Sequence, residues 1–169
     1  DLTKEWQEGK INYCYTIRQD GDIGVEKILF HRITKRRAEV IKVTLDNNEQ
    51  IVCTSDHKFM LRDGPYVQAK DLKPRMSLMP FRHKISEIKN RITIVGYKMV
   101  LNPKTNKWIF AHLLSDKYNL ENNVYSQVQG AYKHHVDFNK LNNNPDNIKR
   151  LSKNEHLGIH RANVKLTLH

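Results

Sequence analysis

The sequence of 169 residues predicts a β-rich N-terminal half followed by a smaller α+β unit, and three features indicate this division. Short runs of β-branched and aromatic residues alternate with turn-forming clusters as far as Phe81, which is typical of a compact all-β unit. The stretch RHKISEIKNR, residues 82–91, is polar and mostly basic without a clear period. Histidine and asparagine then concentrate near the C-terminus. We expect domains over residues 1–81 and 93–169, joined by a basic linker over residues 82–92.

The first half is expected to hold one short helix, residues 3–8, and a series of short strands. The clearest hairpin signal is the turn Asp46-Asn47-Asn48 between two β-branched runs. Alternation in the first of these runs puts Ile41 and Val43 on one face. The expected strands cover residues 13–18, 24–33, 39–45, 50–54, 58–61 and 66–67.

The second half is expected to begin with a hairpin and a helix. Residues 97–101 and 108–110 flank the turn-rich NPKTN, and residues 111–118 have helical apolar spacing. Near the C-terminus the pattern reads strand, loop, strand, helix. Ser152 followed by Glu155 forms a capping box, which predicts that the last helix starts just after Leu151.

Composition limits the partners and the compartment. The formal net charge of +11 and a pI near 9.7 indicate a polyanionic partner, with a generic basic protein as the alternative. No apolar run reaches the roughly 18 residues that a membrane span needs, and nothing resembles a signal peptide. Cys14 and Cys53 lie in strand-like stretches, and we interpret them as buried free thiols of a reducing, cytoplasmic protein.

The segment HHVDFNKLNNNPDNIKRLSKNEHLGIH carries the candidate chemistry. His156 and His160 are four residues apart, so on a helix they share one face and can bind one metal ion. His134 and His135 are adjacent and point to opposite faces of a strand. Both serve one site only if the backbone bends locally, which the turn-rich loop permits.

These residue types suit phosphodiester hydrolysis. A neutral imidazole can take a proton from water, and a divalent metal can neutralise the charge that develops on the phosphate. Scattered surface histidines and a structural metal knuckle are the alternatives. Four histidines around a central Asn147 argue against the first, and the extra histidine beside a ligand argues against the second.

The same segment resembles the HNH, or ββα-metal, nuclease motif in its HH…N…H…H pattern. The resemblance implies that His135 is the general base and that Asn147 braces the loop and orients this base. The implied metal ligands are His134, His156 and His160. The metal would be Mg²⁺, Mn²⁺, Zn²⁺ or Ni²⁺, and imidazoles suit the last three better than Mg²⁺.

The HNH resemblance also names a partner, double-stranded DNA, and phosphate-contacting side chains. The candidates for phosphate contact are Lys140, Lys149, Arg150 and Arg161. The likeness extends back to Gly96, where GYKMV…WIFAHLLSDKYN is similar to the hairpin and helix that precede the motif in homing nucleases. We interpret His112 in that helix as structural.

The stretch VCTSDHKFMLRDGPYVQAKDLKPRMSLMPF resembles the Hint fold of inteins. Thr54 to His57 match its T-x-x-H motif, whose Thr and His polarise the peptide bond at the upstream splice junction and ease an acyl shift. Arg75 stands where the family often has Gly. Residues 9–81 resemble the cyanobacterial inteins of DNA gyrase B proteins, and the likeness continues into the nuclease segment.

Both ends depart from the intein pattern. The chain begins with Asp1 where an intein has Cys or Ser, and it ends in His169 where an intein has His-Asn. We expect a central fragment that cannot splice alone and needs complementary N- and C-terminal intein fragments. The predicted function is an intein fragment with an HNH homing endonuclease. One alternative is a splicing module with a relic, non-cleaving HNH domain, which the complete histidine set argues against. The other is a non-enzymatic DNA-binding or structural metal protein.

Overall fold

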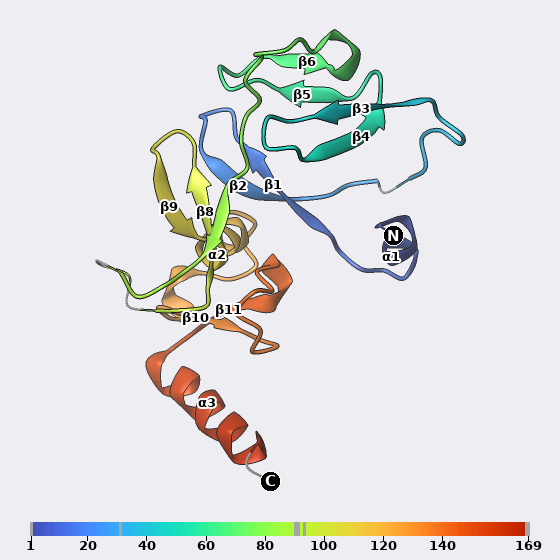
Figure 1. The fold of residues 1–169 in the computed structure, drawn as a ribbon. Helices are drawn as coiled ribbons and strands as arrows, with labels where there is room; N and C mark the ends of the chain where they lie inside the picture. The colour runs from blue at the N-terminus through green and yellow to red at the C-terminus, as the bar shows by residue number, and fades with distance from the viewer. Residues whose placement is uncertain (1, 31, 90–91, 93, 168–169) are drawn as a thin grey trace. The chain divides into compact units, whose positions relative to one another are not determined.

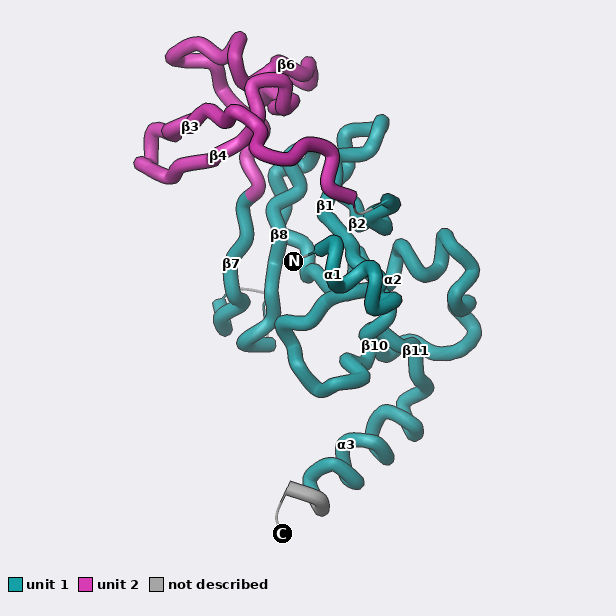
Figure 2. Tube along the Cα trace, turned by 90° about the vertical axis from the view of Figure 1, so that its right-hand side faces the viewer, with its two compact units in different colours: residues 1–31, 82–169 teal, residues 32–81 magenta. Residues whose placement is uncertain are grey.

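A computed structural model describes residues 2–30, 32–89, 92 and 94–167. Small antiparallel sheets and a few helices make up this part of the chain, in agreement with the predicted β-rich character (Figure 1). Contacts divide the chain into unit 1, residues 1–31 with 82–169, and unit 2, residues 32–81 (Figure 2). The upper bound of unit 2 coincides with the division expected at residue 81. The N-terminal 31 residues, however, group with the C-terminal part.

The N-terminal segment of unit 1 forms a helix and a hairpin. These are α1 (Leu2–Gln7), β1 (Tyr13–Ile17) and β2 (Ile23–Lys27), with β1 antiparallel to β2. The strand expected over residues 24–33 ends at Lys27. Phe30 has a φ of 56°, outside the extended region, so the ladder cannot run on to it.

A three-stranded sheet and a helix follow in unit 1. The sheet contains β7 (His83–Ile85), β8 (Lys98–Asn102) and β9 (Lys107–Phe110) in that order, and α2 (Ala111–Glu121) follows β9 directly. The predicted linker over residues 82–92 therefore includes a strand. Strand β7 is exposed and short, and only its pairing with β8, for example His83 with Val100, defines it.

The hairpin β1–β2 packs on α2 and β8, which explains why residues 1–31 belong to unit 1. The buried apolar cluster joins Ile23 and Val25 of β2 to Val100 of β8 and to Ala111 and Leu114 of α2. Burying apolar area at this scale is the main stabilising contribution to such a contact.

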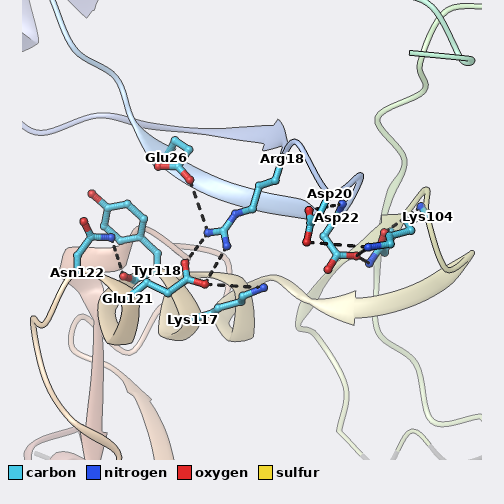
Figure 3. Close-up of polar contacts among 10 residues, drawn as sticks. Arg18, Asp20, Asp22, Glu26, Lys104, Lys117, Tyr118, Glu121 and Asn122 are labelled. Atoms are coloured by element: carbon cyan, nitrogen blue, oxygen red, sulfur yellow. Dashed lines mark hydrogen bonds and ion pairs between the residues drawn. The ribbon is translucent and has the colours of Figure 1, made fainter.

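Polar contacts at the edge of this cluster link the same elements (Figure 3). The guanidinium of Arg18 donates to both carboxylate oxygens of Glu121, at 2.9 and 2.7 Å. Arg18 also lies 3.6 Å from Glu26. On the other side, Lys104 Nζ lies 4.0 Å from Asp20 and 3.9 Å from Asp22.

The C-terminal part of unit 1 has the predicted strand–loop–strand–helix order. Its elements are η2 (Gln127–Gln129), β10 (Tyr132–His135), η3 (Pro145–Asn147), β11 (Ile148–Leu151) and α3 (Lys153–Thr167). The capping box is confirmed, because Ser152 N donates to Glu155 Oε2 at 2.8 Å and Glu155 N donates to Ser152 Oγ at 3.4 Å. Gly130, with φ 144°, is needed before β10, since a Cβ there would collide with the Leu151 carbonyl.

Unit 2 consists of two hairpins and one turn of 3₁₀ helix. Its elements are β3 (Val40–Thr44), β4 (Gln50–Thr54), β5 (Lys58–Met60), β6 (Tyr66–Gln68) and η1 (Ala69–Asp71). The β3–β4 hairpin confirms the strongest turn signal, with Asn48 at φ 65°. Ile41 and Val43 are half-buried while their neighbours along β3 are exposed, as the alternation predicts.

The cysteines are free, but the prediction that they are buried is wrong for Cys14. Strand alternation turns Tyr13 and Tyr15 of β1 toward the apolar cluster, so Cys14 between them faces outward. Cys53 is half-buried. Within the part of the chain that the structure describes, no helix has the length and apolarity to cross a membrane.

Candidate active site

The paired histidines of β10 lie on opposite faces of the β10–β11 hairpin. The register pairs His134 with Lys149 and His135 with Ile148, and both histidines are buried, with 5% and 6% of their surface exposed. The His134 ring contacts His156 and His160 of α3, whereas the His135 ring contacts Tyr97 and His112. The bend expected at the pair comes after it, at Phe138, whose φ is 59°.

The three predicted metal ligands lie together. One nitrogen from each of His134, His156 and His160 lies within 4.8 Å of the other two. His156 and His160 occupy consecutive turns of α3, and their ring centroids are 4.5 Å apart. Tetrahedral bonds of about 2.1 Å would put such nitrogens roughly 3.4 Å apart, so a small inward movement of α3 would complete a metal site.

The electrostatics of the three imidazoles favour the neutral form that binds metal. Burial, and then the neighbouring His160 and His156, lowers the pKa of His134. Burial and His160 lower the pKa of His156 as well. Because a neutral imidazole is the ligating species, this cluster is suited to a cation near neutral pH. The Phe138 ring lies 5.0 Å from the His134 ring and 5.5 Å from the His160 ring, which forms an apolar wall.

The loop between β10 and β11 is held by Asn147, the central asparagine of the motif. Its Nδ2 donates to Asp137 Oδ1 and to the Asn142 carbonyl, both at 2.8 Å, and its Oδ1 accepts from Asp137 N at 3.0 Å. Asn142 Nδ2 and Asn139 N also donate to the Asp137 carboxylate. Burial acts to raise the pKa of Asp137, but these hydrogen bonds lower it overall, so the carboxylate stays charged.

The side chain that contacts His135 is Asn143, and the sequence did not single it out for this role. His135 Nε2 lies 3.1 Å from Asn143 Oδ1. The hydrogen bonds of Asn147 go to the loop, so among the described residues its influence on the base passes through the loop. Sequence reasoning could not separate the asparagines of the run LNNNPDN, because each has the same chemistry.

Helix α2 supports the loop from the His135 side with buried polar side chains. The Ser115 hydroxyl donates to the Asn143 carbonyl, and Asn119 Nδ2 donates to the Pro145 carbonyl at 2.7 Å. Asp116 pairs with Arg150 of β11, with Nε and Nη2 each 2.7 Å from a carboxylate oxygen. The polar residues on the helix face opposite to solvent were the available signal for this role.

The four predicted DNA-contacting residues fall into two groups. Lys140, Lys149 and Arg161 are exposed, as a phosphate contact requires. Arg150 is not: its side chain is 10% exposed, and its remaining nitrogen Nη1 donates to the Gly130 carbonyl at 3.1 Å. Alternation along β11 turns Lys149 outward and Arg150 toward α2. We therefore correct the interpretation of Arg150 to a structural one.

His112 begins α2 beneath His135 and is 9% exposed. Burial, and then the nearby His135 and Lys133, lowers its pKa to about 4, so the ring is neutral at pH 7. Its Nδ1 is buried without a hydrogen-bond partner among the described residues. Its ring contacts Phe110 and Tyr97, which agrees with the structural role expected from the sequence.

The other predicted catalytic pair, Thr54 and His57, lies in unit 2. The two residues form one turn after β4, in which His57 N donates to the Thr54 carbonyl at 3.1 Å. The His57 side chain is exposed, and its ring contacts Phe59 edge-on at 5.1 Å. Hydrogen bonds from the Thr54 and Lys35 side chains lower the pKa of Asp56 within the same turn. The turn therefore brings together the residues of the T-x-x-H motif.

Comparison with known proteins places this site in a longer context. No protein-family model matches the chain, and no solved structure matches it. The chain is 54% identical over 169 residues to the DNA gyrase B protein of Synechocystis sp., a match that covers 99% of the chain and 16% of that protein. The chain thus spans about a sixth of the length of this relative. A match of a whole chain to so small a part indicates an inserted segment.

Proposed function

We propose that this chain is an intein segment that carries an HNH homing endonuclease, which hydrolyses phosphodiester bonds of double-stranded DNA with a divalent metal. The observation that supports this most is the meeting of His134, His156 and His160 on one face of the β10–β11 hairpin, beside a braced His135. The partial match to a DNA gyrase B protein supports the intein context, because inteins are inserts in host proteins.

The proposed reaction uses the chain's own groups in defined roles. His135 takes a proton from a water molecule whose oxygen attacks phosphorus, the P–O bond to the leaving oxygen breaks, and solvent protonates that oxygen. A divalent metal held by the three imidazoles would neutralise charge on the scissile phosphate. Lys140, Lys149 and Arg161 are exposed and contact phosphates on either side. Asn147 and Asp137 keep the loop between the strands in one conformation.

The test is cleavage of supercoiled plasmid DNA carrying a gyrase B coding sequence, with Mn²⁺, Zn²⁺, Ni²⁺ or Mg²⁺ and with a chelator. Metal-dependent cleavage is expected, and His135→Ala should slow it about 100-fold to 10,000-fold because the general base is lost. Metal affinity by calorimetry should change little. The control is His83→Ala, which removes an exposed histidine of β7.

Two results would contradict this proposal. Cleavage by His135→Ala within a few-fold of the parent chain would remove His135 from the mechanism. DNA binding without cleavage under every metal would support the relic, non-cleaving alternative.

We further propose that Thr54 and His57 act in protein splicing when complementary N- and C-terminal intein fragments are supplied. The turn that joins these residues supports the proposal. Mixing the three pieces with a thiol trap should yield thioester, and His57→Ala should slow its formation far more than it weakens assembly. Assembly with an unchanged thioester rate would contradict the role of His57.

A further inference from the structure

The orientation of the Asn143 amide is fixed by its own hydrogen bonds. Its Nδ2 donates to the Leu141 carbonyl at 3.0 Å and to the Lys140 carbonyl at 3.4 Å. Rotating the amide by half a turn would put Oδ1 against two carbonyl oxygens and lose both bonds. The Asn143 carbonyl accepts from the Ser115 hydroxyl of α2, which also holds the backbone. The oxygen of this amide must therefore face His135.

An amide oxygen can only accept, so the nitrogen opposite it must donate. That nitrogen is His135 Nε2, 3.1 Å from Asn143 Oδ1. A neutral imidazole carries one N–H, and placing it on Nε2 leaves the lone pair on Nδ1. The tautomer of His135 thus follows from the donors that Asn143 spends elsewhere.

The second nitrogen of His135 is in the state that this assignment requires. Among the described residues, Nδ1 of His135 has no hydrogen-bond partner, and it is not one of the side-chain nitrogens sealed from solvent without one. His112 Nδ1, in the neighbouring ring, is sealed in this way. A water molecule can consequently reach Nδ1 of His135, whereas Nε2 is engaged.

We propose that Asn143 is the positioning residue that holds His135 in the Nε2–H tautomer, so that Nδ1 is the atom that receives the proton. This inference rests on the proposed nuclease function and assigns one residue and one atom within it. When Nδ1 takes up a proton, the Nε2–H donor belongs to a cation, and its bond to Asn143 becomes charge-assisted and stronger. The contact thereby stabilises the protonated base that the reaction generates.

The experiment is a long-range ¹H–¹⁵N spectrum of the histidine rings of the full chain at pH 8, where ordinary histidines are neutral. His135→Gln identifies the His135 signals by their loss. We expect the Nε2–H pattern for His135 in the parent chain and a mixture of tautomers in Asn143→Leu, which keeps the side-chain size but removes the acceptor. Asn143→Asp should keep the Nε2–H pattern, because a carboxylate oxygen also only accepts. It serves as the second variant if Asn143→Leu does not fold. The control is Asn144→Ala, since no side-chain hydrogen bond to His135 comes from that residue.

The same variants are then assayed for DNA cleavage and metal affinity. Asn143→Leu should cleave at least about 10-fold more slowly with unchanged metal affinity, a part of what a general base contributes. An Nδ1–H pattern in the parent chain, or an unchanged pattern in Asn143→Leu, overturns the inference. If the parent chain shows the Nε2–H pattern and Asn143→Leu loses it but no metal supports cleavage, the nuclease function fails while the role of Asn143 in setting the tautomer stands.

Discussion

The two sides of the β10–β11 hairpin are built differently. On the His135 side, α2 contributes six buried residues, among them Ser115, Asp116 and Asn119, and each of these three bonds to the loop or to β11. On the His134 side, α3 has no buried residue over 153–164, and its contact with β10 runs through His156 and His160.

The difference suggests a division of labour. Buried, fully bonded polar networks fix one geometry, so the base side is preorganised by the protein. An exposed helix attached through three imidazoles has few apolar contacts to hold it, and a cation would add the missing interaction. The predictions below test this contrast, from the largest expected effect to the smallest.

Removing the buried arginine of the α2 side should give the largest loss of stability. Arg150→Met leaves the Asp116 carboxylate buried without its cation, which typically costs about 3–5 kcal/mol. The neighbouring change Lys149→Met removes an exposed charge and should alter stability by less than about 0.5 kcal/mol. Urea unfolding of the two variants measures this, and equal losses would contradict the structural role of Arg150.

His112 should make the α2 side sensitive to acid. Its pKa of about 4 in the folded chain lies below the ordinary 6.5, so the unfolded chain binds more protons between these values. The contribution of neutral His112 is complete above pH 6.5 and is lost as the pH falls toward 4, by about 3 kcal/mol in all. Besides His135 and Lys133, Asp116 also acts on this ring, in the opposite direction.

The check is the free energy of unfolding at pH 7.5 and pH 4.5, without metal, in the parent chain and in His112→Phe. The parent chain should lose more stability than the variant. Because His134 and His156 titrate in both proteins, the difference between them isolates His112. Equal losses would mean that His112 is not held neutral by the fold.

Metal should affect the α3 side most. At 100 times its dissociation constant, a ligand that binds only the folded chain adds about 2.7 kcal/mol of stability. Hydrogen exchange should slow more in α3 than in α2 when Zn²⁺ or Ni²⁺ is added, and His156→Ala should abolish the change. Protection that is equal in the two helices, or that persists in His156→Ala, would contradict metal binding at this cluster.

Sequence reasoning succeeded where local signals decide the outcome. The hairpin at Asn48, the capping box at Ser152 and the grouping of three histidines depend on residues close in sequence or on helical spacing. It did not anticipate the inclusion of residues 1–31 in unit 1. That grouping depends on contacts such as Arg18 with Glu121, 103 residues apart, which no local pattern encodes.

Within the site, sequence reasoning failed where chemically identical residues compete or where a partner is distant. The run of asparagines offered no way to tell that Asn143 contacts the base while Asn147 holds the loop. Arg150 was grouped with the phosphate-contacting residues because its partner Asp116 lies 34 positions away. The outward position of Cys14 follows from strand phase, which is fixed only when β1 packs on α2.

The smallest expected effects come from the helix propensity of α3, and they bear most directly on how loosely this side is held. Ser152→Ala removes the hydroxyl that caps the helix and should lower its stability by about 1 kcal/mol. Gly158→Ala should raise it by about 0.5–1 kcal/mol, because a Cβ there meets no atom within 4 Å and a glycine is costly in a helix. Since His156 and His160 depend on this helix, metal affinity measured by calorimetry should fall a few-fold in Ser152→Ala and rise in Gly158→Ala. The ¹⁵N signals of His135 should stay unchanged in both variants, because α2 and Asn143 hold that ring. A shift of the His135 signals as large as the change at His156 would show that the two sides of the hairpin form one cooperative unit instead of two.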